Sequence, residues 1–481
     1  MTRRIYGVGV ALMVLLVALI ANLTYVQVLH ADAIKNRPDN QRLTLAEYNY
    51  ERGPILIGPN AVAKSVPTSG QLAYLRQYAD GPRNVAITGF YSIIYGRTGL
   101  ERQANAVLSG TDDRFLKDRL GQLFAGKTPR GGAVVTTINP AAQAAAEREM
   151  AGRPGAVVAI DPRTGAILAL YSSPTFDPNG LASHDATKVQ AYYNKLITDP
   201  AQPMLNRPLA RTYPPGSTFK LVTAAAALSS GKYTPQSVVP GPAALPLPNS
   251  THVLTNWFHT ACGPNGKITL TLALDISCNT AFASIGMALG PDALRQQAEN
   301  FGWGHSFAVP MVAAASGFAE NPDMAQTAQS AIGQFDTTAT ALQMALVAAG
   351  IGNQGIVMNP YLIAEELAPD LSVVGRTQPS QFRRAISAGV AAQMTTMMVT
   401  VVDHGTATSM RIPGVEVGAK TGTAEVGPGG KPHAWMVGLA PANNPQVAVA
   451  VVIENGGGAA EISGNGLAGP VAHAVIQAVL K

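Results

Sequence analysis

Charged side chains are scarce in this 481-residue sequence: Asp, Glu, Lys and Arg make up 13% of it, against 47% apolar residues. This balance excludes a disordered chain, and the 48 glycines and 34 prolines indicate a globular protein rich in loops. The formal net charge is +5, but lysine and arginine form no dense run and no basic helical face. No nucleic-acid partner is therefore predicted. The length predicts more than one domain.

Several functional patterns are missing as well. No Gly-x-Ser-x-Gly elbow occurs, which disfavours a Ser-His-Asp hydrolase. Histidines have no metal-ligand spacing, and His404 and His433 fit packing or surface roles better than metal binding. No repeat of fixed period is present, which argues against solenoids and propellers. We predict neither a metal nor a cofactor.

Cysteine is nearly absent, because Cys262 and Cys278 are the only two. Export to an oxidising compartment would permit a disulfide between them, whereas two buried thiols are an equally good interpretation. If the two residues pair, the bridge would tether Cys278, which lies between Ser277 and Asn279.

The one long apolar run lies at the N-terminus. Residues 5–28 are long enough to span a bilayer, and Arg3 and Arg4 precede them. Arginines before the run and none directly after it favour a cytoplasmic tail at residues 1–4 and an exported body. We therefore expect a single-pass protein of the plasma membrane, with its exported body outside the cytoplasm. A cleaved signal peptide is the alternative, because Ala31-Asp32-Ala33 resembles a cleavage site, but the length of the run favours an uncleaved anchor.

Two further regions follow the anchor. Residues 29–132 combine short mixed segments with many turns and show no visible chemistry, which predicts a small pedestal domain. Glu51 to Ile55 and Gly99 to Glu101 are typical of turn and docking positions. Gly, Lys, Thr, Pro and Arg cluster at residues 126–132, our candidate linker. Residues 133–481 would form the second domain.

The second domain is predicted to carry strands at both ends and helices between them. Strands are expected at residues 134–138, 155–160, 166–171, 415–425, 433–439 and 446–454, and helices at 140–150, 217–228, 269–289, 292–301, 337–349 and 470–480. Five strands from the two ends could form one antiparallel sheet. This arrangement predicts an α+β fold.

Ser217 is the first candidate for chemistry. It follows Pro214-Pro215-Gly216 and stands at a helix start, where a serine is most often only an N-cap. Lys220, three residues later, shares the same helical face, and a desolvated or cation-flanked lysine can take a proton from a hydroxyl. The similar spacing of Ser229 and Lys232 lies at the other end of the helix, where a C-cap explains it.

Two further groups follow in the sequence. Ser277 could relay a proton and Asn279 could bind an amide, although the pair alone would read as polar residues inside a helix. Lys420, Thr421, Gly422 and Thr423 lie on a strand whose small side chains would admit a substrate backbone and a carboxylate. An exposed edge strand with a protective lysine is the alternative. Ser463-Gly464-Asn465 repeats the second pattern in a Gly-rich tail that loop chemistry explains.

These motifs, in this order, resemble those of class B penicillin-binding proteins. The residues that carry the resemblance are Pro215-Gly216-Ser217-Thr218-Phe219-Lys220, Ser277-Cys278-Asn279 and Lys420-Thr421-Gly422-Thr423-Ala424-Glu425, supported by Arg52-Gly53-Pro54-Ile55, Gly99-Leu100-Glu101, Ala331-Ile332-Gly333-Gln334 and His433-Ala434-Trp435. The short pedestal is most similar to the actinobacterial penicillin-binding protein A subfamily. No glycosyltransferase-like region precedes it, which disfavours a bifunctional class A enzyme.

The resemblance implies a transpeptidase fold like that of serine β-lactamases, with an antiparallel five-stranded sheet and helices. It implies D,D-transpeptidation of peptidoglycan stem peptides, with β-lactams as covalent inhibitors. Ser217 would be the nucleophile, Lys220 the base and Ser277 a proton relay. Asn279 would orient the substrate amide, while Lys420, Thr421, Gly422 and Thr423 would line the carboxylate site. The backbone amides of Ser217 and Thr423 would form the oxyanion hole.

The resemblance also suggests partners and leaves alternatives. A glycan polymerase of the SEDS class would be a partner, together with proteins of division or elongation. A D,D-carboxypeptidase is the nearest alternative activity, and a membrane-anchored β-lactamase or β-lactam sensor is more distant. A catalytically idle scaffold is the alternative outside the enzymes.

Overall fold

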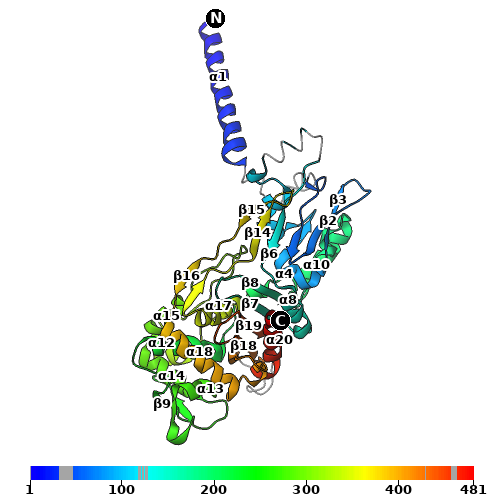
Figure 1. Ribbon diagram of the computed structural model, residues 1–481. Helices are drawn as coiled ribbons and strands as arrows, with labels where there is room; N and C mark the ends of the chain where they lie inside the picture. Colours follow the sequence, from blue (N-terminus) through cyan, green and yellow to red (C-terminus); the bar gives the residue numbers. More distant parts are fainter. Residues whose placement is uncertain are drawn as a thin grey trace.

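The computed structural model describes residues 2–31, 47–116, 121, 124, 128–427, 430–456 and 463–481. Helix α1 (Thr2–Thr24) continues into the π-helical turn η1 (Tyr25–Leu29) and projects from the body of the molecule (Figure 1). Its segment Tyr6–Leu29 is 24 residues long, apolar enough to cross a membrane, and unburied. The helix is therefore a candidate membrane span.

A six-stranded sheet forms the centre of the pedestal. Its strands, in spatial order, are β15 (Val373–Arg376), β14 (Ile363–Leu367), β6 (Ala133–Thr136), β1 (Ile55–Ile57), β2 (Asn60–Pro67) and β3 (Tyr74–Tyr78). Neighbours are antiparallel except β1 and β6, which are parallel. Residues 363–376 thus return to this sheet after most of the second region has been traversed. The boundary between residues 132 and 133 stays a prediction, and residues 126 and 127 of the candidate linker lie outside the described residues.

A buried ion-pair network joins the two pedestal segments that the sequence suggested as docking positions. Glu101 is fully buried and accepts hydrogen bonds from Arg52 Nε and Arg76 Nε, each at 2.6 Å. Arg76 also donates to the backbone oxygens of Arg52 and Gly53. Because Glu101 lies in α5 (Gly99–Gln103), Arg76 in β3 and Arg52 in the segment before β1, this network joins the helix to the sheet.

The second region contains the predicted five-stranded sheet, so that expectation is confirmed. Its antiparallel order is β17 (Gly418–Ala424), β18 (His433–Ala440), β19 (Val447–Ile453), β7 (Gly155–Ile160) and β8 (Ile167–Ser173). Every residue of β7, β18 and β19 is buried. Because strand side chains alternate between faces, both faces must be covered. Helices α8 (Pro140–Met150), α17 (Ala341–Gly352) and α20 (Gly469–Leu480) pack on it.

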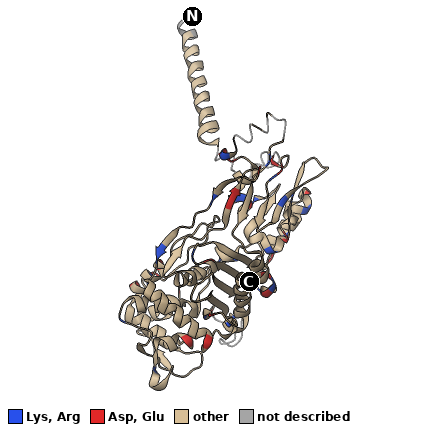
Figure 2. Ribbon diagram, in the orientation of Figure 1, with Lys and Arg blue, Asp and Glu red and all other residues tan. Residues whose placement is uncertain are grey.

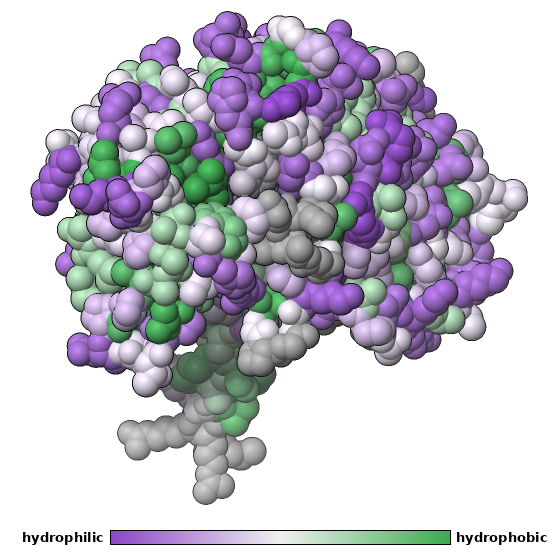
Figure 3. Space-filling model, turned by 90° about the horizontal axis from the view of Figure 1, so that it is seen from below, coloured by the Kyte–Doolittle hydropathy of each residue, from purple (hydrophilic) through white to green (hydrophobic). Residues whose placement is uncertain are grey.

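Helices α12, α13, α14, α15 and α18 gather beside the β17 end of the sheet, whereas α4 and α10 lie near β2 and β3 of the pedestal (Figure 1). The helix predicted at residues 269–289 is wrong as one element: α13 (Leu270–Asp275) ends before Ser277, whose φ is 58°, and α14 begins at Asn279. Helix α18 (Ala388–Asp403) was not predicted, nor was α10 (Ala186–Thr198). Charged residues are thinly spread over this part of the ribbon (Figure 2), and the face opposite α1 mixes hydrophobic with hydrophilic side chains (Figure 3).

The described residues also form the short 3-10 turns η2 (Asp113–Phe115), η4 (Pro264–Gly266) and η5 (Thr408–Met410), together with further elements. These further elements are α4 (Gly81–Thr88), β4 (Tyr91–Ser92), β5 (Gly96–Arg97), α5 (Gly99–Gln103), α6 (Asn105–Ser109), α9 (Asn179–Ala182), α11 (Arg207–Ala210), η3 (Gly216–Phe219), α12 (Lys220–Ser229), β9 (Val238–Pro240), β10 (Ala244–Pro246), β11 (Val253–Thr255), β12 (Lys267–Thr269), α14 (Asn279–Leu289), α15 (Pro291–Asn300), α16 (Met324–Ser330), β13 (Ile356–Met358), β16 (Gln381–Arg384) and the π-helical η6 (Ser463–Ala468).

Candidate active site

Ser217 lies in the short 3-10 turn η3, directly before α12. Gly216 has a φ of 53°, its amide donates to the Gly333 oxygen at 2.9 Å, and a Cβ there would clash with the backbone of Thr423. Only glycine fits this approach, which seats η3 against β17. Neither η3 nor α12 has a side-chain cap, so Ser217 is not an N-cap. Its hydroxyl lines a cleft.

Lys220 and the second motif meet behind Ser217. The Lys220 ammonium is fully buried and donates to the Ser277 carbonyl oxygen at 2.7 Å, to Ser277 Oγ at 3.2 Å and to Asn279 Oδ1 at 2.7 Å. Among the described residues, no hydrogen bond joins Lys220 to the Ser217 hydroxyl. Lys220 nevertheless stands one helical turn after Ser217, on the same side of the helix.

The left-handed backbone at Ser277 explains why this motif is a break in a helix rather than its interior. Ser277 ends α13, and Cys278 and Asn279 start α14. Cys278 forms a disulfide with Cys262, so the two cysteines are not free thiols. On the same side, Trp257 Nε1 donates to the Ile276 oxygen at 3.3 Å. The loop before Cys262 is therefore fastened to the break that presents Ser277.

Lys420 completes the cluster from β17. Its fully buried ammonium donates to Ser277 Oγ and to the Thr421 oxygen, both at 3.0 Å. The interpretation as an exposed edge lysine is therefore wrong. Lys420 stands behind the cleft wall, whereas Thr421 and Thr423 line the cleft. Gly422 packs on Thr218 and Trp435, where a Cβ would come within 2.8 Å and 2.9 Å of their side-chain carbons.

Burial lowers the pKa of both lysines, and the charge of Lys420 acts on Lys220 as well. Burial lowers the pKa of Lys220 well below its usual value, and the positive charge of Lys420 lowers it further. Burial lowers the pKa of Lys420 to about 7, although the carboxylate of Asp275 partly opposes this. For the Asp275 carboxyl group, burial has the opposite effect and raises the pKa. Because the charge of Lys420 lowers the pKa of Lys220, loss of the proton from Lys220 is favoured while Lys420 is charged.

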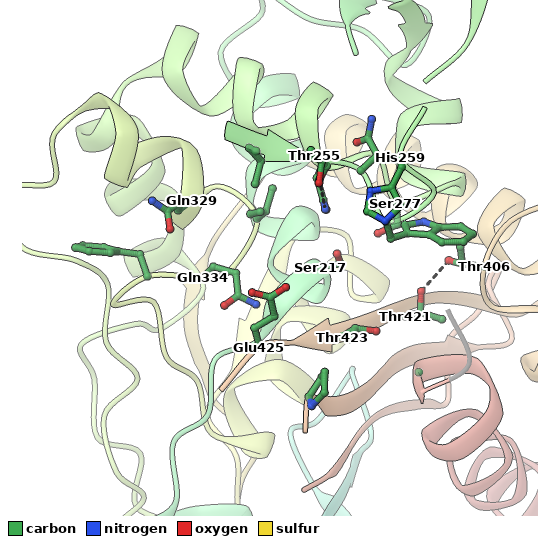
Figure 4. A pocket seen from close by; sticks show the side chains of 18 of the residues that line it. Ser217, Thr255, His259, Ser277, Gln329, Gln334, Thr406, Thr421, Thr423 and Glu425 are labelled. Carbon is green, nitrogen blue, oxygen red and sulfur yellow. Dashed lines mark hydrogen bonds between the residues drawn. The ribbon is translucent and has the colours of Figure 1, made fainter. Parts of the chain in front are cut away.

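The cleft has a volume of about 640 Å³ and brings the three motifs to one surface (Figure 4). Its described lining comprises Ser217, His252, Val253, Leu254, Thr255, Asn256, Trp257, His259, Ser277, Asn279, Gln329, Ile332, Gln334, Phe335, Thr406, Thr421, Thr423, Glu425, Pro432 and Gly464. Sequence reasoning missed the wall at residues 252–259 and Thr406, whose hydroxyl lies 2.7 Å from that of Thr421. No spacing signal marks these residues, because packing alone brings them to the cleft.

Of the two repeated motifs, Ser229 to Lys232 lies apart from the cleft, whereas Ser463 to Asn465 contributes to its lining. Ser229 is exposed at the end of α12, as expected for a cap position. The Ser463-Gly464-Asn465 stretch is more than a loop tail, because Gly464 lines the cleft and packs on the Gly422 oxygen, where a Cβ would lie at 3.1 Å. Asn465 binds Ser409 and Thr408, away from the lysines. His433 packs edge-on against Tyr213, and no His, Cys, Asp or Glu cluster in the described ranges could hold a metal ion.

Comparison with known proteins identifies this arrangement. Residues 155–477 match the family described as "Penicillin binding protein transpeptidase domain" and residues 52–134 the "Penicillin binding protein A dimerisation domain". The chain belongs to the class B penicillin-binding proteins. It is 44% identical to the peptidoglycan D,D-transpeptidase PbpA of Mycolicibacterium smegmatis, covering 100% of this chain and 99% of that protein. With its counterpart from Mycobacterium tuberculosis it shares 42% identity over the same proportions.

Solved structures agree with these sequence matches. The ceftriaxone acyl-enzyme of M. tuberculosis penicillin-binding protein A superposes with a TM-score of 0.88 at 43% identity, over 91% of this chain and all of that one. Its imipenem acyl-enzyme gives 0.87, also at 43% identity, with the same coverage. The predicted family, fold and serine-type transpeptidase class are therefore confirmed. The roles of individual residues remain predictions.

Proposed function

We propose that this penicillin-binding protein cross-links peptidoglycan stem peptides by D,D-transpeptidation, with Ser217 as the nucleophile. The observation that carries the assignment of residues is the convergence of Lys220 and Lys420 on Ser277 Oγ, at 3.2 Å and 3.0 Å, behind the wall of the cleft that Ser217 lines. Such a buried pair can keep one amine neutral as a base while the other stays charged.

In the acylation step, Ser217 Oγ attacks the carbonyl carbon of the bond between the two terminal D-alanines. Lys220 takes the hydroxyl proton, and the amides of Ser217 and Thr423 stabilise the oxyanion, each by about 3 kcal/mol. The C–N bond then breaks, and Ser277 passes a proton to the departing amine of D-alanine. Asn279 holds the substrate amide, and the Thr421 and Thr423 hydroxyls bind the carboxylate, with Lys420 behind them supplying positive charge.

In the second step, the amine of a neighbouring stem attacks the ester carbon of the acyl-enzyme. The new amide forms as the bond to Ser217 Oγ breaks, and the proton of the amine returns to Ser217 through Lys220. A β-lactam takes the place of the first substrate and leaves its acyl group on Ser217. An extended substrate would lie in the cleft beside β17 as an added strand.

Product analysis tests this function. We expect the full chain in detergent, given a peptide ending in D-Ala-D-Ala and a primary amine, to release D-alanine and form the peptide amide. Exclusive formation of the hydrolysed peptide would indicate a carboxypeptidase instead. Rapid turnover of penicillin would indicate a β-lactamase, and no acylation at all would leave the scaffold interpretation.

A plot of the rate of penicillin acylation against pH should be bell-shaped. The second-order rate constant rises as Lys220 loses its proton and falls as Lys420 loses its own, within about one unit of pH 7. The arginine in Lys420→Arg stays charged at all these pH values. The falling limb of the pH–rate curve of this variant should therefore move to higher pH. An unchanged falling limb in this variant would assign that limb to another group.

The membrane and its proteins complete the proposal. Helix α1 anchors the chain in the plasma membrane and holds the catalytic domain on the outer side. A glycan polymerase of the SEDS class is the partner that would contact the anchor and pedestal, together with proteins of division or elongation. The apolar length of α1 over Tyr6–Leu29 fits a membrane span, beside which such a partner would lie.

A further inference from the structure

The cleft contains a single fixed negative charge among its described lining residues, Glu425. No lysine or arginine is among those residues, because the ammonium groups of Lys220 and Lys420 are buried behind the wall. Glu425 is exposed to solvent and forms no ion pair or hydrogen bond with any residue in the described part of the chain. The role of this carboxylate is not explained by the acyl-transfer machinery.

Strand geometry aligns Glu425 with the groups that hold the substrate. Thr421, Thr423 and Glu425 line the cleft, whereas the intervening Gly422 and Ala424 do not. This is the alternation of a β-strand, carried one residue past the end of β17 at Ala424. In Figure 4, the Glu425 carboxylate points toward Gln334 and the Ser217 region, and Thr421 lies at the opposite side with Thr406. The row therefore runs from a carboxylate-binding end to an anionic end.

A peptide that reacts with Ser217 must lie along this row in one direction. Its terminal carboxylate belongs at Thr421 and Thr423, and its reacting carbonyl belongs at Ser217. The residue that precedes the two D-alanines then lies further along β17 by one to two strand residues. At the rise of a β-strand this is a distance of about 3–7 Å. That is the side on which Glu425 stands.

Donor and acceptor stems in cross-linking are copies of the same peptide, so the donor also carries the amine that serves as acceptor in another copy. We propose that Glu425 is a specificity subsite that binds this ammonium group on the donor, on the residue preceding D-Ala-D-Ala. The inference rests on the proposed function and extends it to substrate choice. The contact between Glu425 and the ammonium group would be ionic and lie at the edge of the cleft. It would select the substrate but take no part in the chemical steps.

Two peptides that differ in one charge test the proposal. Nα-acetyl-L-lysyl-D-alanyl-D-alanine carries the ammonium group, and Nα,Nε-diacetyl-L-lysyl-D-alanyl-D-alanine does not. Each peptide would protect Ser217 from labelling by fluorescent penicillin. The measured quantity is the ratio of the two half-protective concentrations, uncharged over charged peptide. Because both are measured on the same variant, a change in labelling rate cancels from the ratio. We expect the charged peptide to protect at about fivefold lower concentration in the natural chain, as for a partly exposed ion pair. Added salt should reduce that ratio.

Glu425→Gln should bring the ratio to about one, and Glu425→Lys should invert it. Glu416→Gln is the matched control, because Glu416 is exposed just before β17 and does not line the cleft; its ratio should stay near five. Equal protection in the natural chain, no protection, or a preference that survives Glu425→Gln would overturn the subsite. So would an effect of Glu425→Gln confined to the acceptor amine in the cross-linking assay. Failure of the proposed function is distinct, since the product analysis would then show only hydrolysed peptide or turned-over penicillin, whatever the ratio.

Discussion

Replacing Ser217 with alanine is expected to abolish covalent labelling by fluorescent penicillin, lowering the acylation rate by at least about 10⁴-fold. The loss is large because the hydroxyl oxygen forms the bond to the acyl group, and no neighbouring cleft group has the same position relative to Lys220. The variant should fold normally, since Ser217 has no side-chain capping role and alanine adds no atoms. Gel fluorescence after a timed exposure measures the first expectation, and thermal unfolding measures the second.

Ser229→Ala is the matched control for that experiment. Ser229 repeats the Ser-x-x-Lys spacing with Lys232, but it lies exposed at the far end of α12. Its substitution should leave labelling unchanged and alter the free energy of unfolding by less than about 0.5 kcal/mol. Persistent labelling of Ser217→Ala at the natural rate would assign the nucleophile to another residue.

The five-stranded sheet could be predicted because each of its strands shows a local sequence pattern. Strand β7 and helix α8 begin and end at the predicted residues. Pro140 suits the first helical turn, and the Asn139 side chain caps α8 by accepting from the amides of Ala141 and Ala142. The order of the motifs likewise indicated that Ser217, Ser277 and Lys420 belong to one site, in which Ser217 and Ser277 line the cleft and Lys420 stands behind its wall.

Features that depend on contacts between distant segments were not predictable. A polar residue at 277 fits a helix interior as well as a break, and only packing shows that its backbone is left-handed. The alternation around Lys420 indicates a strand, but its burial depends on Ser277, 143 residues earlier. Strand β14 joins the pedestal sheet through β6, a pairing between residues more than 200 positions apart. No local periodicity records such a partner.

The pedestal network offers the second large effect, on stability rather than activity. Glu101→Ala removes the carboxylate between Arg52 and Arg76, whose side chains are only 4% and 1% exposed. Both guanidinium groups keep backbone partners but lose their counter-ion. Two uncompensated buried charges should cost about 3–5 kcal/mol of pedestal stability. Hydrogen exchange of amides in β1 and β3 measures this locally, without assuming that the whole chain unfolds in one step.

Glu149→Ala is the control for this loss, because it breaks the exposed pair with Arg148, at 2.9 Å, and should cost less than about 0.5 kcal/mol. Burial alone would raise the pKa of Glu101, but Arg76 and Arg52 outweigh it and hold the pKa below its usual value. A lowered folded-state pKa means that the stabilisation is present above the ordinary carboxyl pKa of about 4.3 and is lost as pH falls through the lowered value. Acidification should therefore lower the protection factors of these amides, which are corrected for the slower intrinsic exchange in acid, in the natural pedestal, but should change those of Glu101→Ala less. Equal exchange rates in Glu101→Ala and Glu149→Ala at neutral pH would show that the network does not hold the pedestal together.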